Sequence, residues 1–458
     1  MKIAPILAAL RRRAQRIVAQ LVLSDSGLAT RSPNLSGAFP AMSTGRALVT
    51  NALWALLWHL LSRGSVIMAA IILARALLTP DFAAFSYFQL TVSMIAAYAS
   101  LGLGITASRY FAEIGHERVG VRRAPLGTMC LVSLLISIGA ALLILAIPQN
   151  WLSAGLNVPH WMLAAGVACV ALGVVPSGAI IGLERYRAAT LIALGYGMLV
   201  MIGAWLAARY QRPGLAMGAL AIGALLQAVA QFMIVLRATG WQRINETFGL
   251  KMIDVRHVLQ FAGPMFAVGL MAASGSWLVG RIILHGADGK HAFALYSIGL
   301  QWFALALVLP GMVSRVVLPR LVRAAGVARE EARQLVRHGA ALAIGTATVM
   351  TLTAVMLGPW IIEIYGPQYS AGRRFIAAYM GVGILSASAN TLGNVIIAND
   401  GQIVWLLGTA AWMFVLIITA HAAAIAGFEA WTGVIAQTAA TFILVVLAYL
   451  FCRHQELV

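Results

Sequence analysis

Arg63 lies near the middle of an apolar run that is long enough to cross a membrane. His59 comes four residues earlier and Ser62 is adjacent, so a helix would place all three on one side. A charged side chain at the centre of a membrane helix costs about 2.5–3.5 kcal/mol on insertion scales, so it normally faces a bundle interior or a watery cavity. Guanidinium groups pair well with phosphate oxygens. We therefore predict that Arg63 and His59 bind a diphosphate, although a hydrogen-bonded core histidine is an alternative for His59.

Arg281 is the second basic residue that lies deep in an apolar run, where it forms a helical stripe with Ser274 and Trp277. In the internal repeat described below, Arg281 corresponds to Ala70 and not to Arg63. The two arginines therefore differ in depth by seven residues, about 10 Å along a helix axis. We predict that Arg281 also binds the diphosphate, since cations at two depths could pass an anion along a path. A side chain near a helix end can also snorkel to the interface, so both interpretations stay open for Arg281.

Acidic residues are absent from the centres of the apolar runs. Those in or beside the runs lie near the run ends: Asp81, Glu184, Glu363, Asp400 and Glu429. A cavity that contains arginine without a carboxylate favours an anionic cargo over a cation.

Neutral polar side chains within the runs could line the same cavity. Such groups hydrogen-bond sugars, but helix–helix contacts in membranes use the same residue types. The candidates for the cavity lining are Ser62, Gln89, Ser274, Trp277, Gln301, Asn390 and Asn394.

No constellation for catalysis or metal binding occurs in the sequence. There is no His/Glu metal motif, no glycine-rich phosphate loop and no plausible Ser/His/Asp set. The three cysteines stand singly, as small core residues do. We expect a protein that is not an enzyme and that needs neither a cofactor nor a metal.

The composition requires a membrane. Of 458 residues, 61% are hydrophobic and 10% charged, and the mean hydropathy is +0.88. A soluble domain cannot hide so much apolar surface. Twelve runs of about 20 residues or more predict an all-α polytopic protein. They lie near 50–76, 82–104, 125–147, 160–183, 188–209, 213–236, 258–284, 291–314, 337–363, 373–398, 402–425 and 429–452.

The two sets of six runs resemble each other. FAAFS at 82–86 matches FALYS at 293–297, a separation of 211 residues. Three more matches share that separation: Gly64-Ser65 with Gly275-Ser276, IIL at 71–73 with IIL at 282–284, and Arg109 with Arg320. Six helices per repeat give both halves one orientation, so a parallel pseudo-two-fold should relate two six-helix lobes around a central path.

The net charge of +18 is concentrated in alternate loops and at the N-terminus. This positive-inside pattern places both termini in the cytoplasm and argues against nucleic acid as a partner. The predicted organisation is a basic N-terminal segment that could form an interfacial helix, an N-lobe, a linker and a C-lobe. Their bounds are 1–46, 47–240, 241–257 and 258–458.

Three segments carry a family resemblance. IILARALLTPDFAAFSYFQLTVSMIAAYASLGLGITASRYFAE at 71–113 resembles the first two helices of Wzx-type polysaccharide flippases, whose pattern is "LARxLxPxxFGxY" followed by "LGLxxAxxRYxA". GAIIGLERYR at 178–187 and LGPWIIEIYGPQYSAG at 357–372 are also similar to that family. Ala83 and Ala84 stand where the family often has glycine, and the two extra helices of the lipid II flippases are absent.

The resemblance implies the multidrug/oligosaccharidyl-lipid/polysaccharide exporter superfamily, with a MATE-like, V-shaped pair of lobes in the bacterial inner membrane. It also implies alternating access and an undecaprenyl-diphosphate-linked oligosaccharide as cargo, for O-antigen, capsule or exopolysaccharide synthesis. The expected partners are this lipid-linked oligosaccharide and membrane lipids, with a polysaccharide polymerase and a chain-length regulator as further candidates. Two alternatives remain: a multidrug cation antiporter, and a non-transporting scaffold or polymerase of glycan assembly.

Overall fold

The computed structural model describes residues 45–99, 103–114, 126–239, 252–314, 329–370, 372–399 and 401–455. The chain divides into two compact units, Met1–Thr50 and Asn51–Val458. Of the first unit only the beginning of helix α2 is described, so nearly all of the predicted basic segment 1–46 lies outside the described residues. The second unit contains everything that follows.

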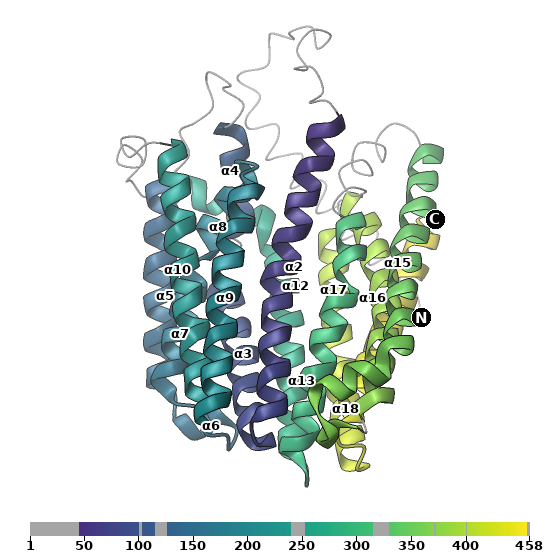
Figure 1. The fold of residues 1–458 in the computed structure, drawn as a ribbon. Helices are drawn as coiled ribbons and strands as arrows, with labels where there is room; N and C mark the ends of the chain where they lie inside the picture. Colours follow the sequence, from purple (N-terminus) through teal and green to yellow (C-terminus); the bar gives the residue numbers. More distant parts are fainter. Residues whose placement is uncertain are drawn as a thin grey trace, which may run out of the picture. The chain divides into compact units, whose positions relative to one another are not determined.

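The first half of the chain supplies nine described helices (Figure 1). They are α2 (Gly45–Ala76), α3 (Thr79–Ala99), α4 (Leu103–Ile114), α5 (Leu126–Ala146), α6 (Gln149–Ser153), α7 (His160–Leu172), α8 (Val174–Gly182), α9 (Tyr186–Tyr210) and α10 (Pro213–Thr239).

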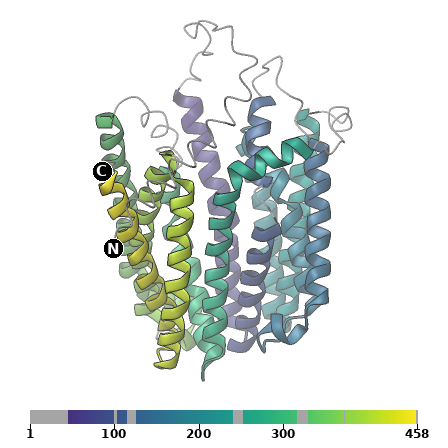
Figure 2. The same cartoon turned by 180° about the vertical axis from the view of Figure 1, so that it is seen from behind.

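The second half supplies six described α-helices and one 3₁₀ turn, η2 (Pro367–Tyr369) (Figure 2). The α-helices are α12 (Met252–Leu284), α13 (Gly289–Ala306), α15 (Arg329–Tyr365), α16 (Gly372–Ala398), α17 (Gln402–Ile425) and α18 (Trp431–His454). No strand occurs in any of the described ranges.

The apolar runs form the helices that hydropathy predicted. Within the described ranges, 11 helical segments are long and apolar enough to cross a membrane. The remaining predicted span is α3, which is 21 residues long and carries polar side chains such as Gln89. Several bounds differ from the prediction. Helices α12 and α15 begin earlier, at Met252 and Arg329, and α13 ends at Ala306 within the run 291–314. The run 160–183 forms two helices that meet at Gly173. Pro176 lies within the first turn of α8, where the missing amide hydrogen is tolerated.

Helix packing repeats between the two halves. In the first half α7 packs against α3, α5 and α10, and α10 packs against α9. In the second half α16 packs against α13, α15 and α18, and α18 packs against α17. These pairs connect helices of the same rank in each set of six, so the sequence repeat corresponds to a structural repeat and the prediction of two six-helix lobes is confirmed.

Each half also places its first helix against its fifth. A Cβ added to Gly197 of α9 would lie 2.9 Å from the Cβ of Ser65 on α2. A Cβ added to Gly275 of α12 would lie 3.1 Å from the Trp412 ring on α17. Glycine at these two positions permits the close approach of the helices, as in other membrane helix pairs.

The halves meet along α3, which contacts both α12 and α13. Buried aromatic rings fill this junction, with the ring centroids of Tyr87 and Phe293 5.7 Å apart in an edge-to-face arrangement. Further along α3, the hydroxyl groups of Tyr98 and Ser274 form a hydrogen bond. The junction therefore brings together the second helix of one half and the first two helices of the other.

Candidate functional site

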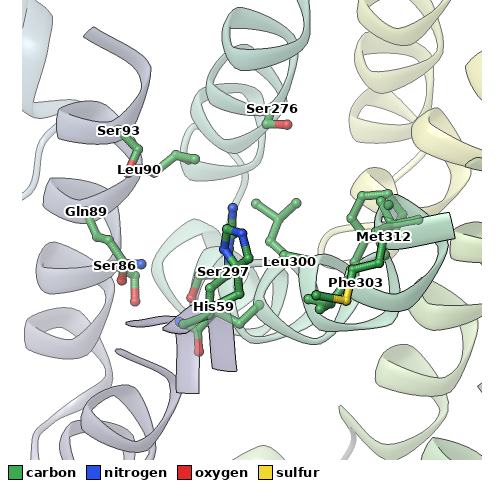
Figure 3. Close-up of a pocket in the computed structure, with 16 residues that line it drawn as sticks. His59, Ser86, Gln89, Leu90, Ser93, Ser276, Ser297, Leu300, Phe303 and Met312 are labelled. Atoms are coloured by element: carbon green, nitrogen blue, oxygen red, sulfur yellow. The ribbon is translucent and has the colours of Figure 1, made fainter. Parts of the chain in front are cut away.

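A cavity of about 510 Å³ lies beside this junction, lined by α2, α3, α12 and the span that begins with α13 (Figure 3). These are the first two helices of each half, so the cavity has the repeat symmetry of the fold. Its polar lining includes His59, Arg63, Ser86, Gln89, Ser297 and Gln301. The sequence-predicted residues His59, Arg63, Gln89 and Gln301 are thus brought together.

The positive charge of the cavity comes from α2. Arg63 is exposed, and His59, one turn earlier, has its ring stacked on that of Trp58 at a centroid distance of 5.1 Å. Neither aspartate nor glutamate occurs among the described residues that line the cavity. An anion that enters the cavity would therefore meet a guanidinium and no competing carboxylate.

Hydroxyl and amide groups cover the α3 wall of the cavity. Ser86, Gln89 and Ser93 are spaced three and four residues apart, so the helix places them on one face. Figure 3 shows these three side chains on successive turns of the same ribbon. Such neutral groups bind sugar hydroxyls without adding charge.

The α13 wall carries matching groups. Ser297 corresponds to Ser86 in the repeat, and both serines are buried and line the cavity. The hydroxyl of Ser297 donates to the backbone carbonyl of Ala294 at 2.8 Å. Gln301, one turn later, faces the same space. The second helix of each half therefore contributes a repeat-related serine and a glutamine, and α3 adds Ser93.

Within the described part of the chain, three side-chain oxygens of this lining are buried without a hydrogen-bond partner: Ser86 Oγ, Gln89 Oε1 and Gln301 Oε1. Leaving such a group unsatisfied costs about 1–3 kcal/mol. Groups of this kind are normally completed by water or by a ligand. The lining therefore has spare hydrogen-bonding capacity next to its positive charge.

The rest of the cavity is apolar. It is lined by Leu300, Phe303, Leu307, Val308 and Met312, which follow the polar turn of α13 along the same span. The cavity thus has a cationic, hydrogen-bonding part and a hydrocarbon part. This combination suits an amphiphile better than a uniformly polar solute.

Arg281 is not part of the described cavity lining. Its guanidinium carbon lies 4.7 Å from the ring centroid of Trp151 and 5.4 Å from that of Trp277. Trp277 donates its indole N–H to the hydroxyl of Thr91 at 3.1 Å. The third residue of the predicted stripe, Ser274, is bonded to Tyr98. The structure does not bring Arg281, Trp277 or Ser274 to the side of Arg63.

The remaining predicted residues lie elsewhere. Asn390 is exposed on α16, and Asn394 lines a much smaller cavity with Val336 and Ser314. Ser62 lies beside Arg63 but its hydroxyl oxygen is buried without a hydrogen-bond partner, and the residue is not in the described cavity lining.

Sequence reasoning missed Ser86, Ser93, Ser276 and Ser297 as cavity residues. A signal for two of them was present, because Ser86 and Ser297 end the repeated pentapeptides FAAFS and FALYS. Within the described residues, no group of three or more His, Cys, Asp or Glu side chains could hold a metal ion.

The chain is similar in sequence to two polysaccharide export proteins. It is 26% identical over 343 residues to the "EPS I polysaccharide export inner membrane protein EpsE" of Ralstonia solanacearum, covering 71% of this chain and 76% of that protein. It is 24% identical over 336 residues to the protein of the same name in Ralstonia nicotianae, with the same shares covered. The chain matches no protein-family model.

Solved transporters share its fold. A multidrug resistance MATE family transporter of the MOP superfamily, in an inward-facing conformation, aligns with a TM-score of 0.71 at 14% identity, over 86% of this chain and 94% of the other. A MOP superfamily transporter from Pyrococcus furiosus, whose title reports "reverse polarity of binding pocket", gives 0.63 at 15% identity, over 90% and 95%.

These similarities confirm the predicted MATE-like fold and the resemblance to the polysaccharide flippases. The chain is a membrane transporter with relatives that are named as export proteins of an inner membrane and not as enzymes.

Proposed function

We propose that this protein is a flippase that moves an undecaprenyl-diphosphate-linked oligosaccharide across the bacterial inner membrane for surface polysaccharide synthesis. The observation that carries the proposal is the cavity between the halves. It combines the guanidinium of Arg63 with a lining of hydroxyl, amide and apolar groups, without a carboxylate among the described lining residues. The two export proteins similar in sequence support the same class of cargo.

Each part of the cargo has a counterpart in this cavity. The diphosphate pairs with Arg63, because guanidinium groups bind phosphate oxygens bidentately. The sugars next to it hydrogen-bond to Ser86, Gln89 and Gln301, whose buried oxygens have no hydrogen-bond partner among the described residues. The apolar residues from Leu300 onward accept the beginning of the lipid chain, and the rest of that chain stays in the bilayer.

Transport requires the cavity to face each side of the membrane in turn. In proteins built from two parallel repeats, the halves rock against each other around a central site. The junction of α3 with α12 and α13 would be the place of this movement. From the charge pattern we expect the basic N-terminal segment and the C-terminus on the cytoplasmic side.

A multidrug cation antiporter is disfavoured by the same lining. A cationic drug or coupling ion needs a carboxylate partner, and the described part of the cavity offers Arg63 instead. The similarity to MATE transporters is below 25% identity and concerns the fold.

The proposal is tested by deleting the gene and complementing it with variants. Arg63→Ala should abolish surface glycan while lipid-linked oligosaccharide accumulates, and Arg63→Lys should restore part of the export because it keeps the charge but not the bidentate geometry. Arg75→Ala is the matched control, since this exposed arginine lies at the end of the same helix and outside the described cavity lining. Full export by Arg63→Ala at normal protein levels would contradict the proposal.

A further inference from the structure

Two short segments occupy corresponding places in the repeat and each reaches the opposite half. The helix α6 joins α5 to α7, and the turn η2 joins α15 to α16, so both connect the third and fourth spanning helices of their half. Each contacts the first helix of the other half near its C-terminal end. In the view of Figure 1, α6 lies at the lower end of the helices.

The first of these contacts between the halves is a cation–π contact of two tryptophans with one arginine. Trp151 of α6 lies over the Arg281 guanidinium of α12, and Trp277 contacts the same guanidinium from α12 itself. The two indole rings are 6.0 Å apart. Trp151 is 54% exposed, so its ring is held here by Arg281 and Trp277 more than by burial.

The second contact between the halves is a hydrogen bond next to an aromatic ring contact. The side-chain amide of Gln368 in η2 donates to the backbone carbonyl of Ala74 in α2 at 2.8 Å. The next residue, Tyr369, places its ring edge-to-face with Phe82 of α3 at 5.9 Å. His291 stacks on the same tyrosine at 5.8 Å, with the ring planes nearly parallel.

The two contacts between the halves correspond in the repeat. Ala74 is equivalent to His285, which is one turn after Arg281 on α12. Both segments therefore hold the same part of the opposite first helix. The α6 contact joins the exposed Trp151 to a cation, whereas the η2 contact consists of one hydrogen bond and the ring of the buried Tyr369.

We propose that α6 and η2 are a pair of latches that hold the two halves together at this end of the helices, and that both must release before the cavity opens there. Arg281 thereby acts as a positioning residue of the closed state instead of a cargo ligand. The consequence for transport depends on the proposed function, but the latches themselves can be tested without any cargo.

The test measures access to the cavity from each side of the membrane. Cys130, Cys169 and Cys452 are replaced by serine, and Ser93→Cys in the cavity serves as the reporter. A membrane-impermeant maleimide is applied to right-side-out and to inverted vesicles. Asp288→Cys, an exposed residue between α12 and α13, identifies which vesicles present the latch end to the reagent.

Trp151→Ala and Gln368→Leu should each raise labelling of the reporter from the latch side several-fold, and the double variant should raise it further. Trp151→Phe should give an intermediate value, because phenylalanine keeps a weaker cation–π contact. Trp161→Ala on α7 is the matched control, since this tryptophan is 63% exposed and no contact between it and an arginine occurs among the described residues. Monodisperse elution in detergent shows that each variant is folded.

Unchanged labelling of the reporter in Trp151→Ala and Gln368→Leu would overturn the proposal that these segments are latches. An equal rise in Trp161→Ala would overturn them as well, because it would indicate general loosening. If the latch variants change labelling but the wild-type protein moves no lipid-linked glycan, the latch proposal is supported and the proposed function is contradicted.

Discussion

Gly197 on α9 faces Ser65 on α2 at a distance that leaves no room for a side chain: an added Cβ would lie 2.9 Å from the serine Cβ. The two residues fix the first helix of the cavity, which carries Arg63, against the fifth helix of the same half. Gly195, two residues away on α9, has no atom within 4 Å of an added Cβ. The same substitution at both glycines therefore distinguishes the effect of helix packing from the effect of helix propensity.

Gly197→Val should lower the melting temperature of the purified protein, because overpacking a tight contact costs about 1–3 kcal/mol. Gly195→Val carries the same change in propensity on the same helix and should melt close to the wild type. Thermal unfolding in detergent measures both. Equal melting temperatures for the two variants would show that the α2–α9 contact is not tight.

The corresponding contact in the second half predicts a parallel result. An added Cβ on Gly275 would lie 2.8 Å from Leu416 and 3.1 Å from Trp412. Gly275→Val should therefore be destabilising by a similar amount, about 1–3 kcal/mol. Gly269→Val on the same helix is the control, because an added Cβ there meets nothing within 4 Å. Comparable thermal shifts at positions 275 and 269 would speak against the repeated packing.

A partly buried polar pair inside the first half gives a third prediction about stability. The Ser177 hydroxyl donates to Gln231 Oε1 at 2.7 Å, but Gln231 Nε2 is buried without a partner. Gln231→Met should be less destabilising than Ser177→Ala, because it removes the unsatisfied amide at similar volume and leaves only the half-buried Ser177 hydroxyl without this partner. Ser177→Ala should be destabilising by about 1–3 kcal/mol, because it leaves the whole amide unpaired. Thermal unfolding in detergent measures both variants. A lower melting temperature for Gln231→Met than for Ser177→Ala would contradict this account of the Ser177–Gln231 pair.

Four amide side chains were predicted from the sequence, and only two of them, Gln89 and Gln301, line the described cavity. Gln89→Leu and Gln301→Leu should reduce export by about two- to tenfold, from about 0.5–1.5 kcal/mol for one hydrogen bond. Asn390→Leu and Asn394→Leu should leave export unchanged, because neither asparagine is in the described cavity lining. Surface glycan at matched protein levels is the readout. Loss of export in the asparagine variants alone would place the cargo elsewhere.

Much of the fold could be predicted because hydropathy and the 211-residue repeat are local or periodic signals. Arg63, Gln89 and Gln301 could be identified for the same reason: each is a polar residue in a run where polarity is costly. The pairing of the cavity walls follows from the repeat, since Ser86 and Ser297 are equivalent positions.

The surroundings of Arg281 could not be predicted. Its partner Trp151 lies 130 residues earlier in the chain, in a connection whose sequence looks like an ordinary interfacial loop. The cation–π contact depends on how the two halves meet, which no local pattern encodes. The break at Gly173 was missed because the apolar run continues through it without a change in hydropathy.

The most direct measurement of the central claim is transfer of an undecaprenyl-diphosphate-linked oligosaccharide between the leaflets of liposomes that contain the purified protein. A lectin added outside reports the glycan in the outer leaflet. The wild type and Arg75→Ala should increase lectin-accessible glycan, Arg63→Ala should remain at the level of protein-free liposomes, and Arg63→Lys should fall between them. Transfer by Arg63→Ala at the wild-type rate would contradict the account.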